Sequence, residues 1–257
     1  MRTVLWFREE GPSECNFGSM RKGAQPSVLI TGGAKRLGLA LAAEALSLGL
    51  DVVIHYRRER HEALCWLRRE CAAKSRVLFV KANLRPQDAA ALVDRALRLK
   101  PGLVGLVNNA SVFAPGDLSD QEHLRATLDS NALVPAALAE AFRHRVRRGW
   151  IVNVTDARVA PLNRTYQNYR ISKLLLQELT RQQAFRYAPD VRVNAIAPGA
   201  ILPAAGTSRS AFRRLARHIP LGRTGDLGAV RQAFAYLVQA EHVTGQTMYV
   251  DGGWHLE

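Results

Sequence analysis

The sequence predicts an α/β protein: one doubly wound domain with a parallel, seven-stranded sheet and helices on both faces of the sheet. From residue 27 onward, short runs of β-branched or apolar residues alternate with longer segments of helical period, which is the pattern of repeated βαβ units. The chain has 257 residues, 47% of them apolar and 23% charged, so it can bury a large core. We therefore expect a globular domain over residues 27–257.

Each element of this fold has its own segment of sequence. The expected strands are Val28–Thr31, Val52–His55, Val77–Val80, Leu103–Val107, Ile151–Val154, Val191–Ile196 and Thr247–Val250. The expected helices are Leu37–Leu48, Glu59–Ala73, Asp88–Leu99, Gln121–His144, Tyr166–Tyr187 and Asp226–Gln239. The irregular stretch Gly199–Ser210 is long for such a fold, and loops of that length usually act as lids or mobile segments. With a short helix expected over Ser210–His218, it would form the wall of a pocket.

Residues 1–26 precede the first strand and are expected to form a flexible extension. Their one short apolar stretch, Val4–Phe7, is shorter than a signal peptide requires. No apolar run approaches the ~18 residues of a membrane-spanning helix. Cys15, Cys65 and Cys71 are spaced like neither a disulfide framework nor a zinc site. We expect a cytoplasmic protein with no metal site and no membrane partner.

The charge balance is strongly basic. Lys and Arg number 36 against 22 Asp and Glu, which gives a formal net charge of +14. Such an excess is compatible with a nucleic acid, an anionic membrane surface or an anionic small molecule as partner. No nucleic-acid-binding motif accompanies the charge, and many arginines lie along amphipathic segments. An ordinary solvated surface is therefore favoured over a nucleic-acid footprint.

The first strand-to-helix junction has the composition of a phosphate-binding turn. It reads Val-Leu-Ile-Thr-Gly-Gly-Ala-Lys-Arg-Leu-Gly from Val28 to Gly38. Glycines let the backbone approach a pyrophosphate, and the N–H groups at the start of a helix point at the negative charge. Because the turn departs from G-x-G-x-x-G, a plain connection is the alternative.

Two arginines follow the second expected strand, where an NAD-preferring protein would carry an acid. The segment reads His-Tyr-Arg-Arg from His55 to Arg58. A guanidinium there can bind a 2′-phosphate bidentately, which an acid would repel. The position favours NADPH over NADH, and a solvated cationic run beside Glu59 is the alternative.

A phenol and an ammonium share one face of a later expected helix. Tyr169 and Lys173 are spaced i, i+4, so both side chains project from the same side. An ammonium near a phenol favours the phenolate and lowers the pKa of the phenol from ~10 towards the working pH. The pair can act as a proton relay, although a solvated surface pair has the same spacing.

In order and spacing, a set of segments resembles the short-chain dehydrogenase/reductase family from Ser27 to the C-terminus. The matching positions are Thr31–Gly38, Asn108–Ser111, Asn131, Tyr169, Lys173, Pro198, Gly199 and Val250–Gly253. The resemblance implies a single Rossmann-type domain with a nicotinamide cofactor, and a homotetramer built through the long helices. It also implies that Tyr169 donates a proton, that Lys173 holds the nicotinamide ribose and that Asn131 supports a water relay.

The resemblance carries a set of cofactor contacts onto this chain. They are Gly32, Lys35, Arg36, Leu37, His55, Tyr56, Arg57, Arg58, Asn83, Leu84, Asn109, Ala110, Ser111, Tyr169, Lys173, Pro198 and Gly199. Asn83 stands where many relatives have an Asp against the adenine, and its side-chain carbonyl can still accept a hydrogen bond from the adenine amino group.

Two departures from the family pattern point to one subfamily. Arg36 replaces the middle glycine of the turn, and Asp156 stands 13 residues before Tyr169, where the family normally has Ser. Pteridine reductases resemble this chain at both positions, and several segments look particularly like bacterial dihydromonapterin reductases. In such proteins Phe113 would stack on the pterin opposite the nicotinamide, while Ser111 and Arg36 would contact the pterin and the cofactor phosphate. A core position is the alternative for Phe113.

The chemistry of Asp156 supports the same subfamily. A Ser hydroxyl donates to a ketone oxygen that becomes anionic, whereas a carboxylate there would repel that oxyanion. An Asp suits a ring C=N, where reduction needs a proton delivered to nitrogen, and it would share that task with Tyr169. The alternative is a capping Asp, with Thr155 taking the Ser role in an ordinary carbonyl reductase.

These observations predict an NADPH-dependent reductase of dihydropteridines that forms the tetrahydro product. The candidate substrates are dihydromonapterin, dihydrobiopterin and dihydrofolate. The catalytic set is Asp156, Tyr169, Lys173 and Asn131, and the substrate contacts are Arg36, Ser111, Phe113, Asp156 and Tyr169. One alternative is a reductase of ketones or acyl carriers on the same fold. A regulatory or nucleic-acid-binding protein on the same scaffold is the non-enzyme alternative, and the intact catalytic set argues against it.

Overall fold

The computed structural model describes residues 23–59, 61–69, 76–159, 164–204 and 206–257. The strands are Ser27–Ile30 (β1), Asp51–Tyr56 (β2), Val77–Lys81 (β3), Leu103–Asn108 (β4), Gly149–Val154 (β5), Val191–Pro198 (β6) and Thr247–Val250 (β7). The helices are Arg36–Ser47 (α1), His61–Arg69 (α2), Ala89–Leu99 (α3), Gln121–Leu128 (α4), Val134–Arg145 (α5), Gln167–Tyr187 (α6), Arg209–Arg214 (α7) and Leu227–Gln239 (α8). The seven expected strands are confirmed, with ends that differ by one or two residues.

The strands form one parallel sheet in the order β3-β2-β1-β4-β5-β6-β7. The chain leaves β1 towards β2 on one side and returns to β4 on the other, so the strand order reverses between β1 and β4. Ligands of open α/β sheets bind outside the carboxyl ends of the strands at such a switch point. The topology thereby positions a site next to the turn that follows β1.

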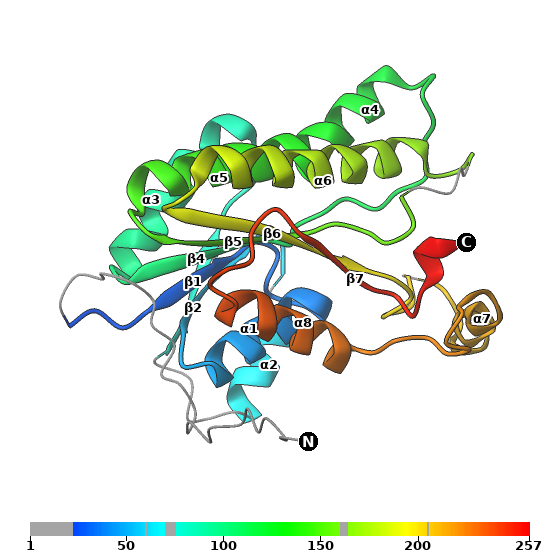
Figure 1. The fold of residues 1–257 in the computed structure, drawn as a ribbon, viewed down its shortest axis with the longest axis horizontal. Coiled ribbons are helices and arrows are strands. Elements are labelled where there is room, and N and C mark those ends of the chain that lie inside the picture. Colours follow the sequence, from blue (N-terminus) through cyan, green and yellow to red (C-terminus); the bar gives the residue numbers. More distant parts are fainter. Residues whose placement is uncertain (1–22, 60, 70–75, 160–163, 205) are drawn as a thin grey trace, which may run out of the picture.

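Helices cover both faces of the sheet, as expected (Figure 1). On one face, α1, α2 and α8 pack on side chains such as Ile30, Ile54 and Val152. On the other face, α3, α5 and α6 pack on the alternating side chains, among them Leu29 and Ile151. Because successive side chains of a strand point to opposite faces, each nearly continuous apolar run supplies both layers.

The segment expected as one helix, Gln121–His144, is divided. It forms α4, a π-helical turn over Asp129–Leu133, and α5. Pro135 lies at the start of α5 and lacks the N–H that a continuous α-helix would donate to the carbonyl of Asn131. The π-helical turn places Asn131 inside the protein, where it is fully buried.

The structure refines three other boundaries. Within the expected helix Glu59–Ala73, α2 begins at His61, and residues 60 and 70–75 lie outside the described residues. A short 3₁₀ turn precedes α3, and another, Leu215–His218, continues α7, so the short helix expected next to the irregular loop is confirmed.

The expected extension of residues 1–26 falls mostly outside the described residues. Its last residues contact the domain: Gln25 Nε2 donates to the carbonyl of Gly49 over 2.6 Å, and Pro26 accepts from the N–H of Asp51 over 2.8 Å. Among the described residues, none of the helices combines the length and apolar character needed to cross a membrane.

Candidate active site

The turn after β1 is tied to the end of β4 at the switch point. Thr31 Oγ1 donates to the carbonyl of Val107 over 3.2 Å and accepts from the N–H groups of Asn109 and Ala110, both over 3.0 Å. Asn109 Nδ2 in turn donates to the carbonyls of Thr31 over 2.9 Å and Gly32 over 3.1 Å. The two strand ends therefore form one rigid edge.

Two positions in and next to this turn accept only glycine. Gly32 has a φ of +61°, and a Cβ at this position would lie 3.0 Å from Cα of Ala110. A Cβ on Gly38 would lie only 2.4 Å from the carbonyl oxygen of Gly32. Because neither position accepts a side chain, the backbone stays open to the close approach that a cofactor pyrophosphate requires.

Arg36 begins α1 with a strained backbone. Its φ is +52°, and within the described ranges no other non-glycine residue has a positive φ, a conformation that persists mainly at functional sites. Its N–H donates to Oε2 of Glu62 over 2.9 Å, so a carboxylate stands at the start of α1, where a phosphate would accept the same hydrogen bond. Its Nη2 atom donates to the carbonyl of Pro203 over 2.6 Å, which links the turn to the irregular loop.

The other expected cofactor contacts near the turn lie at the same edge of the sheet. Lys35 is exposed just before α1. Arg57 and Arg58 are exposed just after β2, and Asn83 is exposed after β3. Partly buried positions are held by Leu37, Tyr56, Leu84 and Ala110. The residues just after β2 present two exposed cations, which suits a phosphorylated ribose.

His55 lies behind the turn. Its ring is almost fully buried, Nδ1 accepts from the N–H of Gly32 over 3.3 Å, and Nε2 donates to the carbonyl of Ala82 over 3.1 Å. These two partners require the neutral ring with its proton on Nε2. Burial also lowers the pKa of His55, with the bond to Ala82 opposing that shift. The ring thus contacts the backbone of the turn and joins it to the end of β3.

The side chain of Asn131 is completely used in internal hydrogen bonds. Its Oδ1 accepts from the N–H of Val112 over 2.8 Å and from Oγ of Ser111 over 3.2 Å, while Nδ2 donates to the carbonyl of Val112 over 2.9 Å and to Ser172 Oγ over 3.0 Å. The amide therefore fastens the loop after β4 to α6. Its backbone carbonyl lacks the N–H that residue 135 would donate in a continuous α-helix, because that residue is proline.

The expected catalytic side chains meet at the carboxyl end of β5. Tyr169 Oη donates to Oδ2 of Asp156 over 2.8 Å, and Asp156 Oδ1 accepts from the N–H of Arg158 over 2.7 Å. Lys173, on the same side of α6, donates from Nζ to the carbonyl of Val154 over 2.8 Å, and Nζ lies 5.9 Å from the centroid of the Tyr169 ring. One face of α6 and one strand end thus combine the phenol, the carboxylate and the ammonium.

Burial dominates the electrostatics of this group. It raises the pKa of Asp156, against the opposing effects of its hydrogen bonds with Arg158 and Tyr169. It raises the pKa of Tyr169 well above 10, and the Asp156 carboxylate adds to that shift. Burial also lowers the pKa of Lys173 to about 8. The lowered Tyr169 pKa expected from the sequence is therefore wrong for this structure, because burial and Asp156 outweigh an ammonium that faces Val154.

Thr155 is directed away from this group. It is buried, its Oγ1 atom donates to the carbonyl of Ile196 over 3.1 Å, and its N–H donates to the same carbonyl over 2.8 Å. Its hydroxyl proton is thus engaged by β6. Asp156, and not Thr155, lies beside the Tyr169 phenol, so the geometry disfavours the alternative in which Thr155 takes the Ser role.

Phe113 is an open aromatic surface beside the catalytic phenol. Its side chain is 54% exposed, so the alternative of a core position is wrong. The ring stacks on Tyr166 with centroids 4.6 Å apart and planes at 6°, and it meets the Tyr169 ring edge to face over 4.8 Å. The exposed ring next to Tyr169 is suited to stacking against a flat heterocycle.

Pro198 and Gly199 close the site on the side of β6. The carbonyl of Pro198 accepts from the N–H of Ala157 over 3.0 Å. A Cβ on Gly199 would lie 2.5 Å from Cβ of Asp251, so only glycine allows the chain to pass there. The carboxylate of Asp251 accepts from the N–H groups of Gly253 and His255 over 3.0 and 2.7 Å, which fixes the C-terminal residues against the site.

Three residues of the site escaped the sequence analysis. Arg158 places its guanidinium 4.5 Å from the ring centroid of Trp254, and Ser172 Oγ donates to the carbonyl of Tyr169 over 2.6 Å while it accepts from Asn131. The sequence could have indicated Ser172, because it directly precedes Lys173 on the same helix. The contact of Arg158 with Trp254 joins residues 96 positions apart, and no local pattern reveals it. In the part of the chain that is described, no group of three or more His, Cys, Asp or Glu side chains is arranged to hold a metal.

The fold and this site define a class of protein. A family profile described as "Enoyl-(Acyl carrier protein) reductase" matches residues 32–255. The chain belongs to the short-chain dehydrogenase/reductase family, and it is an oxidoreductase of that family. The expected Rossmann-type fold and enzyme class are confirmed.

Particular relatives are similar over nearly the whole domain. Dihydromonapterin reductase of Citrobacter koseri is 32% identical over 92% of this chain and 100% of its own length. 3beta-hydroxysteroid dehydrogenase 1 of Eggerthella lenta is 33% identical over 90% of this chain and 94% of its length. A crystal structure of FolM alternative dihydrofolate reductase 1 from Brucella suis, in complex with NADP, is 33% identical and has a TM-score of 0.84 over 90% of this chain and 96% of the other. The resemblance to pteridine and dihydromonapterin reductases is confirmed.

Proposed function

We propose that this protein uses NADPH to reduce a ring C=N of a dihydropteridine to the tetrahydro form. The observation that carries the proposal is the 2.8 Å hydrogen bond between Tyr169 and Asp156. It places a carboxyl group where a ketone reductase needs a neutral hydroxyl donor, and a carboxylate there would repel a developing oxyanion. A ring nitrogen that gains a proton develops no such negative oxygen, so it tolerates and uses the carboxyl group.

NADPH as the cofactor is confirmed by the family and by its NADP-bound structural neighbours. The residues here fit it: the open turn at Gly32 and Gly38 admits the pyrophosphate, and the exposed Arg57 and Arg58 are placed for the 2′-phosphate. When bound, NADPH supplies the hydride. The Glu62 carboxylate that accepts from Arg36 N–H has to leave when a phosphate takes its place.

The chain's own groups supply the proton. Tyr169 remains a neutral phenol because its pKa is raised, so its hydroxyl proton is available for donation. Asp156 shares the hydrogen bond, and its raised pKa makes it a better proton carrier than an exposed carboxylate. In this proposal Lys173 holds the nicotinamide ribose, and the backbone carbonyl of Asn131 orders a water for reprotonation. Phe113 offers the stacking surface for the pterin, next to Ser111.

The candidate substrates are dihydromonapterin, dihydrobiopterin and dihydrofolate, which share the dihydropteridine ring. The second candidate function is reduction of a ketone or an acyl-carrier ketone. It is favoured by the 33% identity to the hydroxysteroid dehydrogenase of Eggerthella lenta. The two functions require different groups at position 156. The carboxyl group of Asp156 favours reduction of a dihydropteridine.

The test is NADPH consumption by the purified protein with dihydromonapterin, dihydrobiopterin, dihydrofolate and a set of simple ketones. We expect turnover of at least one dihydropteridine and none of the ketones. Turnover of ketones alone would overturn the proposal. Tyr169→Phe should reduce kcat by about 100-fold or more, with NADPH still bound at equilibrium, as measured by the change in cofactor fluorescence. Unchanged turnover in this variant would remove Tyr169 from the proton path.

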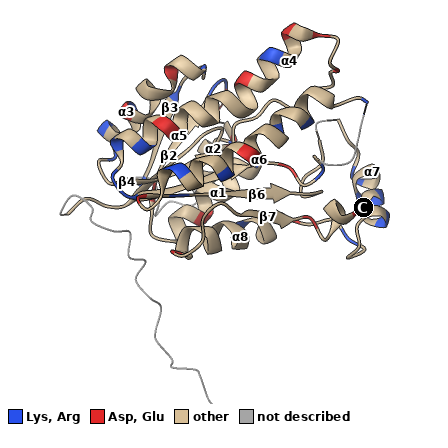
Figure 2. Cartoon of the chain, turned by 45° about the horizontal axis from the view of Figure 1, so that its top comes forward, with Lys and Arg blue, Asp and Glu red and all other residues tan. Residues whose placement is uncertain are grey.

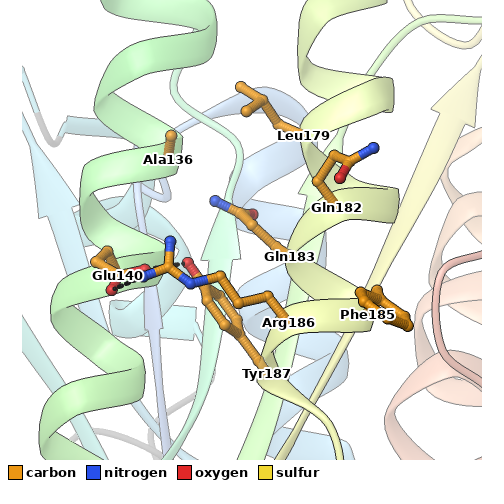
Figure 3. A pocket seen from close by; sticks show the side chains of 8 residues that line it. All are labelled: Ala136, Glu140, Leu179, Gln182, Gln183, Phe185, Arg186 and Tyr187. Atoms are coloured by element: carbon orange, nitrogen blue, oxygen red, sulfur yellow. Dashed lines mark hydrogen bonds and ion pairs between the residues drawn. The ribbon is translucent and has the colours of Figure 1, made fainter.

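We also propose that the protein is a homotetramer that associates through α5 and α6. A groove of about 770 Å³ lies between these helices, with Glu140 at one side and the last residues of α6 at the other (Figure 3). Phe185 points out from α6 and is 89% exposed, and Ile171 and Leu174 of the same helix are also exposed. Exposed apolar side chains in such number on one helix are typical of an interface, and a second copy of this helix pair fits them.

The cytoplasmic location and the absence of a nucleic-acid partner stay predictions. Fractionation of cells that express the native chain tests the location. Binding of a DNA duplex across a range of salt concentrations tests the partner, because phosphate contacts give a steep salt dependence. Tight, salt-sensitive binding would revive the non-enzyme alternative.

A further inference from the structure

A basic segment follows the irregular loop that contacts the cofactor turn through Pro203 and Arg36. Residues 209–218 carry Arg209, Arg213, Arg214, Arg217 and His218, and the chain has no Asp or Glu between Asp190 and Asp226. Figure 2 shows the blue of Lys and Arg on α7, beyond the carboxyl ends of β6 and β7. A second acid-free run, Arg143–Arg148, precedes β5 at the amino end of that strand, so the 209–218 segment is the basic run that lies at the carboxyl side of the sheet.

The cations of this segment share one face. Exposure alternates in pairs: residues 209 and 210, 213 and 214, and 217 and 218 are exposed, whereas residues 211 and 212 and residues 215 and 216 are partly buried. Along α7, a spacing of four residues places Arg209 and Arg213 on the same face, and the exposed Arg217 follows on the 3₁₀ turn. From Arg209 to Arg217 this row is roughly 14 Å long, at about 1.5 Å per residue in the α-helix and about 2 Å per residue in the 3₁₀ turn.

Among the described residues, these arginines form no ion pair with an acid. The ion pairs formed by described residues lie elsewhere, for example between Arg145 and Asp94 or between Arg231 and Glu44. None of them involves an arginine of residues 209–223. Exposed like charges at such spacing repel one another. An anion that binds across the row therefore gains from several charges at once.

Contacts at both ends tie this segment to parts of the active site. Before α7, the carbonyl of Pro203 accepts from the guanidinium of Arg36 in the cofactor turn. After the 3₁₀ turn, the N–H of Leu221 donates to the carbonyl of Gly252 over 3.1 Å. The chain continues from Gly252 to Trp254, whose ring lies against Arg158.

Arg158 completes the connection, because its N–H donates to Asp156. The segment that carries the basic row is therefore anchored at one end to the cofactor turn and at the other to the residues that contact Arg158. A substrate whose ring lies on Phe113 beside Asp156 would extend any long substituent past this row.

We propose that the row Arg209, Arg213, Arg214 and Arg217 binds a polycarboxylate tail on the substrate, and that the preferred substrate is a dihydropteridine with an oligoglutamate side chain. This inference rests on the proposed function, since it assigns the substituent of the same ring. Carboxylates are the groups that guanidinium forks bind with the best geometry. A neutral hydroxylated side chain would leave the row unused.

The test compares two substrates with the same ring, dihydromonapterin and dihydrofolate triglutamate, in steady-state NADPH oxidation. The variant is Arg213→Gln/Arg217→Gln. The matched control is Arg147→Gln/Arg148→Gln, because these two exposed arginines precede β5 at the opposite edge of the sheet. We expect the wild type to favour the triglutamate, and the ratio of kcat/KM values for triglutamate over dihydromonapterin to fall about three- to tenfold in the variant. The control should keep the wild-type ratio.

A binding measurement separates this proposal from the proposed function. Titration of folate triglutamate into the protein–NADP complex should give a Kd that rises with ionic strength in the wild type and that is weaker in the variant. An equal ratio in wild type and variant, or the same loss in the control, would overturn the tail site. A variant that loses affinity for NADPH would instead assign the row to the cofactor and would also overturn it. Absence of turnover with every dihydropteridine, with triglutamate binding intact, would overturn the proposed function and leave the anion site standing.

Discussion

The hydroxyl of Tyr169 and Oδ2 of Asp156 lie 2.8 Å apart, although 13 residues and a change from strand to helix separate them. Arg158 N–H holds the other carboxyl oxygen from the opposite side. The carboxyl group is therefore fixed in both position and rotation, and the phenol is aimed at it. A proton shared by this pair is held at one defined point in the site.

Replacing Asp156 separates the two candidate chemistries. Asp156→Asn keeps the shape but removes the acidic proton, so kcat for the dihydropteridine should fall about 100-fold. Asp156→Ser should show the same loss and gain measurable turnover of a ketone. Thr155→Ser keeps the hydroxyl that donates to Ile196 and serves as the matched control. Equal dihydropteridine turnover in Asp156→Asn and the wild type would contradict the proposed role.

Lys173 makes folding stability depend on pH. Its pKa is lowered from 10.5 to about 8 by burial, so the unfolded chain binds more protons than the folded chain between these values. The free energy of unfolding should therefore rise with pH from about 8 to 10.5.

Lys173→Met should lack this dependence. At neutral pH it should be more stable than the wild type by up to ~3 kcal/mol, although inactive. Urea unfolding at pH 7, 9 and 10.5 measures the difference, which should shrink as the pH rises. A difference that stays constant over this range would show that Lys173 is not buried as a cation.

His55 makes folding stability depend on pH in the acidic range. Its folded-state pKa is lowered below 6.5, so as the pH falls through 6.5 the unfolded chain gains a proton first and stability declines. Protonation of the folded ring would also break the bond from Gly32 N–H. His55→Asn keeps an acceptor for that N–H without a titrating group. Thermal unfolding from pH 7.5 to 5 should show a shallower loss in this variant, and parallel curves would rule His55 out.

The arginines after β2 should set the cofactor preference. Arg57→Ala and Arg58→Ala should each be tested, and loss of a charge-assisted bond to the 2′-phosphate should raise the Kd for NADPH about tenfold. The Kd for NADH should not change, because NADH lacks that phosphate. Arg147→Ala is the control for a general loss of positive charge. An equal effect on both cofactors would assign the arginines to another role.

Phe185 should determine the oligomeric state. Phe185→Asp places a charge on the exposed apolar face of α6, where a second copy would have to desolvate it. Light scattering during size exclusion should show a smaller assembly than the wild type. Tyr236→Asp, an exposed aromatic of α8 outside this face, is the comparison. An unchanged assembly in Phe185→Asp would place the interface elsewhere.

The apolar runs sufficed to predict all seven strands. Because both faces of the sheet are covered by helices, most strands read as a nearly continuous run of apolar residues. The spacing of the family motifs likewise predicted that Asp156, Tyr169 and Lys173 lie together in one site. The π-helical turn around Asn131 was not predictable, since a one-residue change in hydrogen-bond register leaves the side-chain period almost intact. The predicted direction of the Tyr169 pKa shift was wrong for a similar reason. Burial of Tyr169 and Asp156 depends on how the layers pack, and the i, i+4 spacing of Tyr169 and Lys173 carries no information about it.

The guanidinium of Arg36 joins two stretches of chain that lie 167 positions apart. One stretch belongs to the turn after β1, and the other leads into the irregular loop before α7. A descendant of this protein that replaced Arg36 with the glycine usual in its family would relax the strained backbone, but it would release the loop by the same substitution. A substitution at Arg36 therefore acts on the turn and on the loop at once, and neither segment can be altered through this residue alone.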